Sequence, residues 1–421
     1  MLGTLRNALK IGELRRRILF TIGMFIVFRI GALIPVPGVN TAVIEQFFQQ
    51  GNLIGMLNVF SGGALSRFSL FAMSIMPYIN ASIIMQLLTI VVPKFEQWAK
   101  EGVEGRKKLT QYTRYGTVVL ALIQATGMAF WMRNMNALVD PGLDSIAVIV
   151  IVLTAGTAFL MWLGEQITDK GIGNGISLII FAGIVSGLPQ GAVNMVSLLR
   201  AGALNIFTVL ILGVVALAVI AAIVWIQEGQ RRIPVQYSKR VVGRRIYGGQ
   251  STHIPMRVNQ AGVIPVIFAQ SILLFPATIA QFIQHPWAQA VVDFFQAGGT
   301  VYNVSYFLLV VVFTYFYTAV TFNPADVANN LKKYGGFIPG IRPGKPTTQY
   351  LDRVLVRITL VGAIFLATIA VMPQIFQAIF DIPNLWFGGT GLLIVVGVAL
   401  ETMKQIEAHL LMRHYQGFMR R

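Results

Sequence analysis

The feature that most constrains this chain is a series of long stretches without a charged residue. A helix needs about 20 apolar residues to cross the hydrocarbon of a bilayer. Two candidate runs are imperfect: residues 18–34 carry Arg29 near one end, where a long side chain can reach the interface, and residues 385–400 stop before Glu401. The sequence predicts an all-α, polytopic membrane protein with ten spanning helices, because a helix satisfies its own backbone in lipid. The other eight runs are residues 68–93, 115–132, 145–164, 171–199, 201–227, 258–292, 302–322 and 358–380.

The composition supports a membrane protein and excludes several other classes. Charged residues make up 12% of the chain, against about 25% in soluble domains. Cysteine is absent, which excludes thiolate metal sites and cysteine nucleophiles. The sequence also lacks a phosphate loop, a zinc-protease motif and a serine-hydrolase motif. Residues 171–175 (GIGNG) fit a turn between helices better than a nucleotide fingerprint. We expect a protein that is not an enzyme and needs no cofactor or metal.

Positive charge is concentrated on one side of the expected topology. Ten spans place both termini on the same side, and all but four of the 33 Lys and Arg residues fall there. Cytosolic loops of membrane proteins carry an excess of Lys and Arg, so this side is expected to be cytosolic. The four exceptions are Arg29, Arg67, Arg133 and Arg200.

Ten spans divide into two sets of five at the short link near residue 201. The first half comprises residues 1–200 and the second comprises residues 201–421. An odd number of spans in each half inserts the second half upside down relative to the first, as in many transporters. No residue-level repeat between the halves is visible, so this organisation is an architectural inference.

Residues 58–69 do not fit a simple span. The apolar stretch here, residues 53–64, is too short to cross, Ser61-Gly62-Gly63 interrupts it, and Arg67 follows. We interpret them as a short helix that dips into the membrane and turns back, before a full spanning helix from Leu70. Irregular backbone at membrane depth is tolerated only against protein or a water-filled cavity. The segment therefore indicates a cavity.

Three basic loops are longer than turns require: residues 93–114, 228–257 and 323–357. They could serve only to fix the topology, or they could dock an acidic partner such as RNA, lipid headgroups or an acidic protein face. Residues 228–257 mix β-branched residues with charges and turn glycines, which predicts a folded, hairpin-like protrusion. The third loop, rich in Pro and Gly, predicts another stiff protrusion.

Two other functional classes remain open at this point. A secondary transporter for small solutes is also built from inverted five-span halves, but it ordinarily needs a carboxylate near the bilayer midplane. Glu165 and Glu401 lie at the ends of runs instead. A purely structural membrane scaffold explains the spans, but not the re-entrant segment or the large basic loops.

Motifs spread over almost the whole chain carry a family resemblance. They are residues 60–67 (FSGGALSR), 75–79 (IMPYI), 111–116 (QYTRYG), 162–168 (WLGEQIT), 171–177 (GIGNGIS), 250–253 (QSTH), 261–265 (AGVIP) and 340–344 (GIRPG). Together they resemble the SecY family, the channel subunits of the bacterial protein translocase. The resemblance implies an hourglass-shaped channel around a central pore. Its waist would be a ring of six apolar side chains, Ile75, Ile79, Ile176, Ile180, Ile267 and Ile394. Such a ring can exclude water and ions by dewetting.

The resemblance also implies two movable parts. One is a plug that would lie below the ring on its outer side, formed by Asn58, Phe60, Ser61, Gly62, Gly63, Ala64, Leu65 and Arg67. The other is a lateral gate between the helices at residues 70–92 and 260–283, where Asn80, Gln124 and Asn259 match polar positions of the family. An apolar signal sequence would replace these contacts and open the gate toward lipid.

The function implied by the resemblance is a protein-conducting channel in the bacterial cytoplasmic (inner) membrane. It would translocate unfolded secretory polypeptides and release transmembrane segments laterally into the bilayer. The implied partners are the small subunits SecE and SecG, the SecA motor ATPase, the ribosome, signal peptides, nascent chains and membrane lipids. Arg244, Arg245 and Arg342 are the expected docking contacts.

Overall fold

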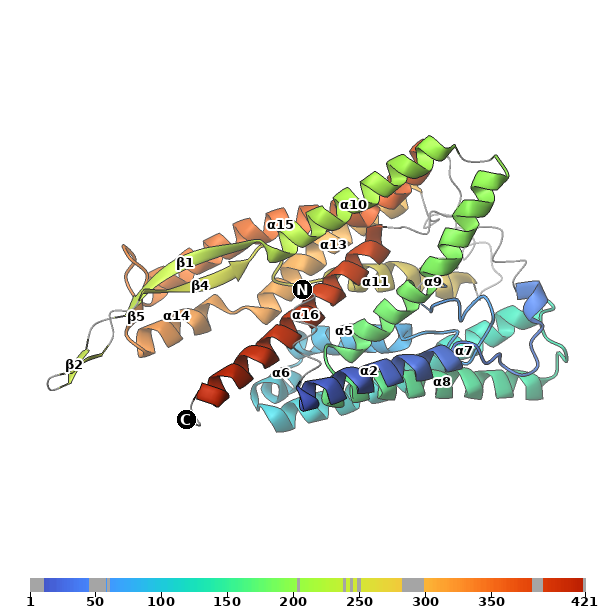
Figure 1. Ribbon diagram of the computed structural model, residues 1–421. Coiled ribbons are helices and arrows are strands. Elements are labelled where there is room, and N and C mark those ends of the chain that lie inside the picture. The colour runs from blue at the N-terminus through green and yellow to red at the C-terminus, as the bar shows by residue number, and fades with distance from the viewer. Residues whose placement is uncertain are drawn as a thin grey trace.

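The computed structural model describes residues 11–44, 58, 61–202, 205–237, 240–242, 245–247, 251–281, 299–380 and 389–418. Long helices dominate, and a small sheet extends from one end of the bundle (Figure 1). Six described helices are long and apolar enough to cross a membrane, and a seventh qualifies if a bent pair counts as one span. The expected count of ten spans stays a prediction.

Apart from α6, which lies in the first basic loop, the helices of the first half overlap the expected apolar runs. Helices α5, α7 and α8 contact one another, and α8 also contacts α2 and α9. The chain bends by 100° between α5 and α6, at Pro93, which begins α6. The six helices are α2 (Gly12–Gly31), α5 (Met76–Val91), α6 (Pro93–Lys100), α7 (Val103–Asn134), α8 (Leu143–Lys170) and α9 (Gly175–Arg200).

The second half has its own bundle, in which α13 contacts α11 and α15, and α16 contacts α10 and α15. Among the described helices, three pairs join the halves: α5 with α11, α7 with α11, and α9 with α16. In Figure 1 the first half lies mainly below and to the right of the second. The helices of this half are α10 (Ile206–Glu228), α11 (Ile264–Gln281), α13 (Thr300–Thr321), α14 (Pro324–Lys333), α15 (Lys345–Phe380) and α16 (Gly389–Phe418).

The predicted re-entrant helix is wrong over its described part, because residues 61–69 form turns. Gly62 and Gly63 have φ angles of 65° and 83°, and Phe68 has 43°, which a right-handed helix does not allow. The spanning helix α5 consequently begins at Met76 and not near Leu70. Pro77 lies in its first turn, where the missing N–H carries no penalty.

Other predicted helix limits also need correction. Helix α11 begins at Ile264 because Gly262 is in the left-handed region, with φ 67°. Helix α15 begins at Lys345, well before the expected residue 358, and α7 begins at Val103. The third basic loop contains a helix, α14, that we did not expect; the Asn323 side chain caps it by accepting from the backbone N–H of Ala325 at 3.0 Å.

The expected hairpin-like protrusion at residues 228–257 is confirmed. Strand β1 pairs antiparallel with both β4 and β5, in the order β4-β1-β5, while β2 and β3 form a separate two-stranded sheet. Buried Ile233, Val235 and Met256 share one apolar cluster with Leu331 and Leu351. We name this body the basic-end unit; it comprises β1 (Gln230–Tyr237), β2 (Arg240–Val242), β3 (Arg245–Tyr247), β4 (Ser251–Arg257), β5 (Gly336–Phe337), α14 and the start of α15.

The glycine-rich residues 171–174 form the expected helix-to-helix turn, and other helices hold it in place. The Thr21 hydroxyl of α2 accepts from the backbone N–H of Ile172 at 3.2 Å, and Gln405 of α16 accepts from the N–H of Gly173 at 2.9 Å. Asn174 caps α9 with its side chain. The turn therefore ties the first half to α16 of the second half.

Candidate functional site

Five of the six expected ring isoleucines are buried within one apolar cluster that spans both halves. Their exposed fractions are 1% for Ile75, 4% for Ile79, 2% for Ile180, 7% for Ile267 and 0% for Ile394. They come from α5 and the residue preceding it, α9, α11 and α16. The helices that join the halves thus contribute all five side chains.

Ile176 is placed differently from the other five. It is partly buried at the edge of the same cluster. A Cβ atom added at Gly164 of α8 would lie 2.7 Å from Ile176 Cδ1, so this side chain packs toward α8. Ile176 and Ile180 do share one helix face, one turn apart. As a ring member, Ile176 rests on the family match alone.

Among the described residues, the fully buried polar side chains are uncharged. All of them are Ser, Thr, Asn or Gln. Glu401, one of the two acids at the span ends, is exposed. Ion-coupled carriers usually place an ionisable group inside the bundle, so the described interior offers no counterpart to that chemistry.

The turn segment, residues 61–75, is held together by short side chains that bond the backbone. The Ser61 hydroxyl accepts from the N–H of Leu65 at 3.1 Å, and Asn58 Oδ1 accepts from the N–H of Ser66 at 2.9 Å. Such local bonds give the backbone an alternative to a helix. Ala64 and Leu65 are buried while Arg67 is exposed. The expected plug residue Phe60 lies outside the described residues.

The turn segment is anchored where the chain leaves α2. The N–H of Val36 donates to the carbonyl of Phe68 at 2.9 Å, and the N–H of Leu70 donates to Ile34 at 2.9 Å. Phe71 stacks on Phe28 of α2 with ring centroids 6.1 Å apart. One end of the segment is therefore fixed to α2, next to Ile75 of the apolar cluster.

Two of the three expected gate residues lie together. Asn80 and Gln124 line one cavity of about 60 Å³, between α5, α7 and α11. Ser271 of α11 lines it too, and its hydroxyl lies 3.6 Å from Met76 Sδ across the seam. Sequence reasoning missed Ser271, although a serine inside an apolar run was a signal for it.

Asn259 lies apart from that cavity. Its side-chain nitrogen donates to the carbonyl of Gly262 at 2.9 Å, within the turn that precedes α11. Its buried Oδ1 has no hydrogen-bond partner in the part of the chain that is described. The three expected gate residues are therefore not one cluster.

The expected docking residues occupy loops and strands at one end of the molecule. Arg342 is exposed in the turn between β5 and α15, where its carbonyl accepts from the Thr347 hydroxyl at 2.8 Å. Arg245 begins β3, and Arg244 lies outside the described residues. Both described arginines belong to the basic-end unit.

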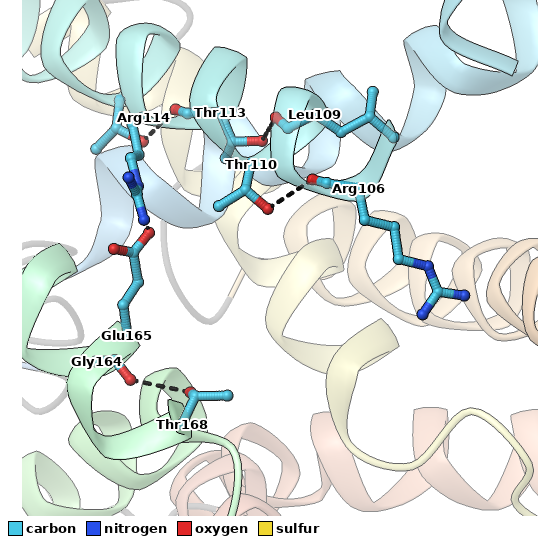
Figure 2. A network of polar contacts seen from close by, with 9 residues as sticks. Arg106, Leu109, Thr110, Thr113, Arg114, Gly164, Glu165 and Thr168 are labelled. Atoms are coloured by element: carbon cyan, nitrogen blue, oxygen red, sulfur yellow. Dashed lines mark hydrogen bonds and ion pairs between the residues drawn. The ribbon is translucent and has the colours of Figure 1, made fainter. Parts of the chain in front are cut away.

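The structure also joins two motifs that the sequence analysis treated separately. Arg114 of α7 donates to Glu165 of α8 at 2.8 Å, as Figure 2 shows. Nearby threonine hydroxyls, including Thr113 and Thr168, bond carbonyls of their own helices (Figure 2). The Arg114 side chain is 49% exposed and that of Glu165 is 16% exposed, and the pair links α7 to α8.

Comparison with known proteins places the chain in a family. The SecY family model matches residues 69–403. The chain belongs to the SecY family. Among curated SecY relatives, "Protein translocase subunit SecY" of Halalkalibacterium halodurans is 54% identical over 432 residues and covers 100% of both chains. The Escherichia coli K12 protein of the same name is 48% identical, over 98% of this chain and 95% of its own.

Solved structures share the SecY-type fold at low sequence identity. One, described as "The structure of a protein conducting channel", has a TM-score of 0.64 at 17% identity and covers 94% of this chain and 92% of its own. Another concerns the plug domain of a SecY protein, with a TM-score of 0.66 at 18% identity, over 94% and 92% of the two chains. A third is Sec61 in a canine ribosome-channel complex, with a TM-score of 0.61 at 16% identity, over 94% and 92%. At these identities the likeness concerns the fold.

Proposed function

We propose that this membrane protein is a protein-conducting channel that translocates unfolded secretory polypeptides and releases transmembrane segments laterally into the bilayer. Membership of the SecY family supports this function, since the relatives are named protein translocase subunits. The rival function, transport of small solutes, is not favoured by these relatives or by the uncharged buried polar groups of the described interior.

The observation that carries the proposal is the apolar cluster at the junction of the halves. Helices α5, α9, α11 and α16 each bring a family-matched isoleucine to it. We propose that the six isoleucines form the ring at the waist. Branched apolar side chains around a narrow passage exclude water and ions. They offer no hydrogen bonds, so a chain of any sequence can slide between them.

The turn segment is proposed as the plug, and the seam between α5 and α11 as the lateral gate. The segment meets the apolar cluster directly, since Ala64 and Ile75 both belong to it. Asn80, Gln124 and Ser271 line the seam cavity. A signal sequence that replaces these few polar contacts with apolar ones would shift the population toward an open gate.

Energy and targeting are proposed to come from partners on the cytosolic side. The described helices α2 and α16 have their basic ends on the same side of the bundle as the basic-end unit (Figure 1), so the positive-inside rule supports cytosolic termini. We propose the bacterial inner membrane, SecE and SecG as companion subunits, and SecA and the ribosome as docking partners at Arg244, Arg245 and Arg342. The two inverted halves at residues 1–200 and 201–421 belong to the same proposal.

Reconstitution tests the function directly. The chain, purified with its small companion subunits, is placed in vesicles with the motor ATPase, ATP and a secretory precursor. We expect the precursor to become protected from external protease only when ATP and an intact signal sequence are both present. Uptake of a radiolabelled solute panel without any protected precursor would support the transporter instead.

A further inference from the structure

Arg29 makes two hydrogen bonds that cross between three parts of the chain. It lies in the last turn of α2. Its Nη1 atom donates to the carbonyl of Gly62 in the turn segment at 2.9 Å, and to the hydroxyl of Ser186 on α9 at 3.1 Å. The side chain therefore turns toward other parts of the protein. A single guanidinium contacts both the turn segment and α9.

The acceptor on α9 has a fixed orientation. The Ser186 hydroxyl donates its only hydrogen to the carbonyl of Gly183 at 2.7 Å. Its oxygen is then left to accept, and a cationic donor suits it better than a neutral one. Ser186 is thus a built partner for a guanidinium, held by its own helix.

Gly62 comes close to the same point of α9. Its φ angle is +65°, a region that side-chain-bearing residues rarely adopt. A Cβ atom there would lie 2.7 Å from Ser186 Oγ and 3.1 Å from Gly183 Cα. Only a residue without a side chain lets the backbone of the turn segment reach both α9 and Arg29. Gly62 is buried at this contact.

We propose that Arg29 is a latch that holds the turn segment in its seated position against α9. This inference rests on the proposed channel function and deepens it. It names Arg29 as the residue whose hydrogen bonds must break before the plug moves. Residues 68–70 stay tied to Ile34 and Val36, just after α2, through backbone bonds, so release at Gly62 lets the tip swing while the base remains attached. Arg29 is a positioning residue: it acts through the segment and not on the passing polypeptide.

The test measures how often the segment leaves its seat. The chain has no cysteine, so Ser61→Cys supplies a single thiol at a position that is 1% exposed. An impermeant maleimide added outside reconstituted vesicles labels that thiol only when the segment is released. Its rate tracks the open population when opening is fast. Adding Arg29→Gln to this background should raise the labelling rate roughly 10- to 100-fold, the range expected for losing charge-assisted hydrogen bonds.

Matched variants distinguish the latch from general damage. Ser186→Ala removes one acceptor and keeps the cation, so it should raise labelling less than Arg29→Gln does. Arg29→Lys should restore part of the protection because it keeps a donor and the charge. Arg133→Gln removes an exposed cation from the end of α7, and should leave labelling within about twofold of the parent if only the latch matters.

The outcomes separate this inference from the proposed function. Labelling that stays at the parental rate in folded Arg29→Gln and in Ser186→Ala would overturn the latch, even if precursor translocation is normal. Equal increases for Arg29→Gln and Arg133→Gln would also overturn it. If the parent chain moves no precursor, the channel proposal fails, whatever the labelling experiment gives.

Discussion

The apolar cluster proposed as the waist and the basic-end unit differ in the kind of surface that each one presents. At the proposed waist, described helices from both halves bring isoleucines into one apolar cluster, and the described buried polar side chains carry no charge. In the basic-end unit a small soluble-type core of Val235, Met256 and Leu351 supports loops that expose arginines. The comparison indicates different requirements. A passage for polypeptides of any sequence needs side chains that form no specific hydrogen bonds. A docking site for partners needs charged side chains on a rigid core.

The largest expected effect breaks the docking side alone. Arg342→Glu reverses the charge of an exposed turn, and interface arginines often contribute about 2 kcal/mol or more. We expect translocation driven by the motor to fall roughly 10- to 100-fold, while resting ion conductance stays unchanged. Vesicle translocation assays and planar-bilayer recordings measure the two. Arg200→Glu, exposed at the other end of the molecule, is the control; equal loss there would remove Arg342 from the docking site.

The next effect breaks the waist alone. Ile180→Ser replaces a side chain that is 2% exposed, and burial of one such side chain is worth about 1.5–3 kcal/mol. Resting conductance should therefore rise roughly tenfold or more, with partner binding intact. Ile180→Val is the conservative control and should change little.

A comparison with Ile176→Ser sharpens the same test. Because Ile176 packs toward Gly164 of α8, its replacement should leak less than that of Ile180. A leak from Ile176→Ser as large as that from Ile180→Ser would instead place Ile176 fully in the ring.

A third variant tests whether the basic-end unit is a platform. Val235 is completely buried in that unit, and Val235→Ala should destabilise it by about 1–2.5 kcal/mol. Hydrogen exchange should speed up in β1 and β4 while the spanning helices stay protected, and partner affinity should fall with the platform. Gln236→Ala, exposed one residue later, serves as the matched control. Unchanged exchange in β4 after Val235→Ala would mean that the sheet is held by something other than this core.

The smallest effect concerns the gate between the two regions. Asn80→Ala and Gln124→Ala each remove a polar group from the seam cavity, worth about 0.6 kcal/mol within membranes. Each should let a precursor with a weakened signal sequence through roughly threefold more often. Asn259→Ala should act differently, since its side chain bonds the turn before α11. If the Asn80, Gln124 and Asn259 variants had equal effects, Asn259 would belong to the gate with the other two.

Sequence reasoning was strongest where one local pattern decides the structure. Charge-free runs located the long helices, since lipid leaves the backbone no other partner. A mixture of β-branched residues, charges and turn glycines predicted the protrusion that contains β1–β4. It was weaker at helix starts, where Gly62, Gly262 and Ser74, with φ angles of 65°, 67° and 54°, override apolar content. Apolar composition indicates which segments can lie in the membrane, but residues with left-handed backbone limit where a helix can begin.

The sequence by itself determined that this chain is a helical membrane protein of the SecY family with its positive charge gathered at one end. It also supplied the isoleucines and showed that residues 58–69 are not a simple span, because residue identity and family motifs are local. Only the tertiary structure decided that Arg29 meets Gly62 and Ser186, that Arg114 meets Glu165, and that two basic loops share one core. Those pairings join residues far apart in the chain, and packing geometry, which no local pattern encodes, selects them.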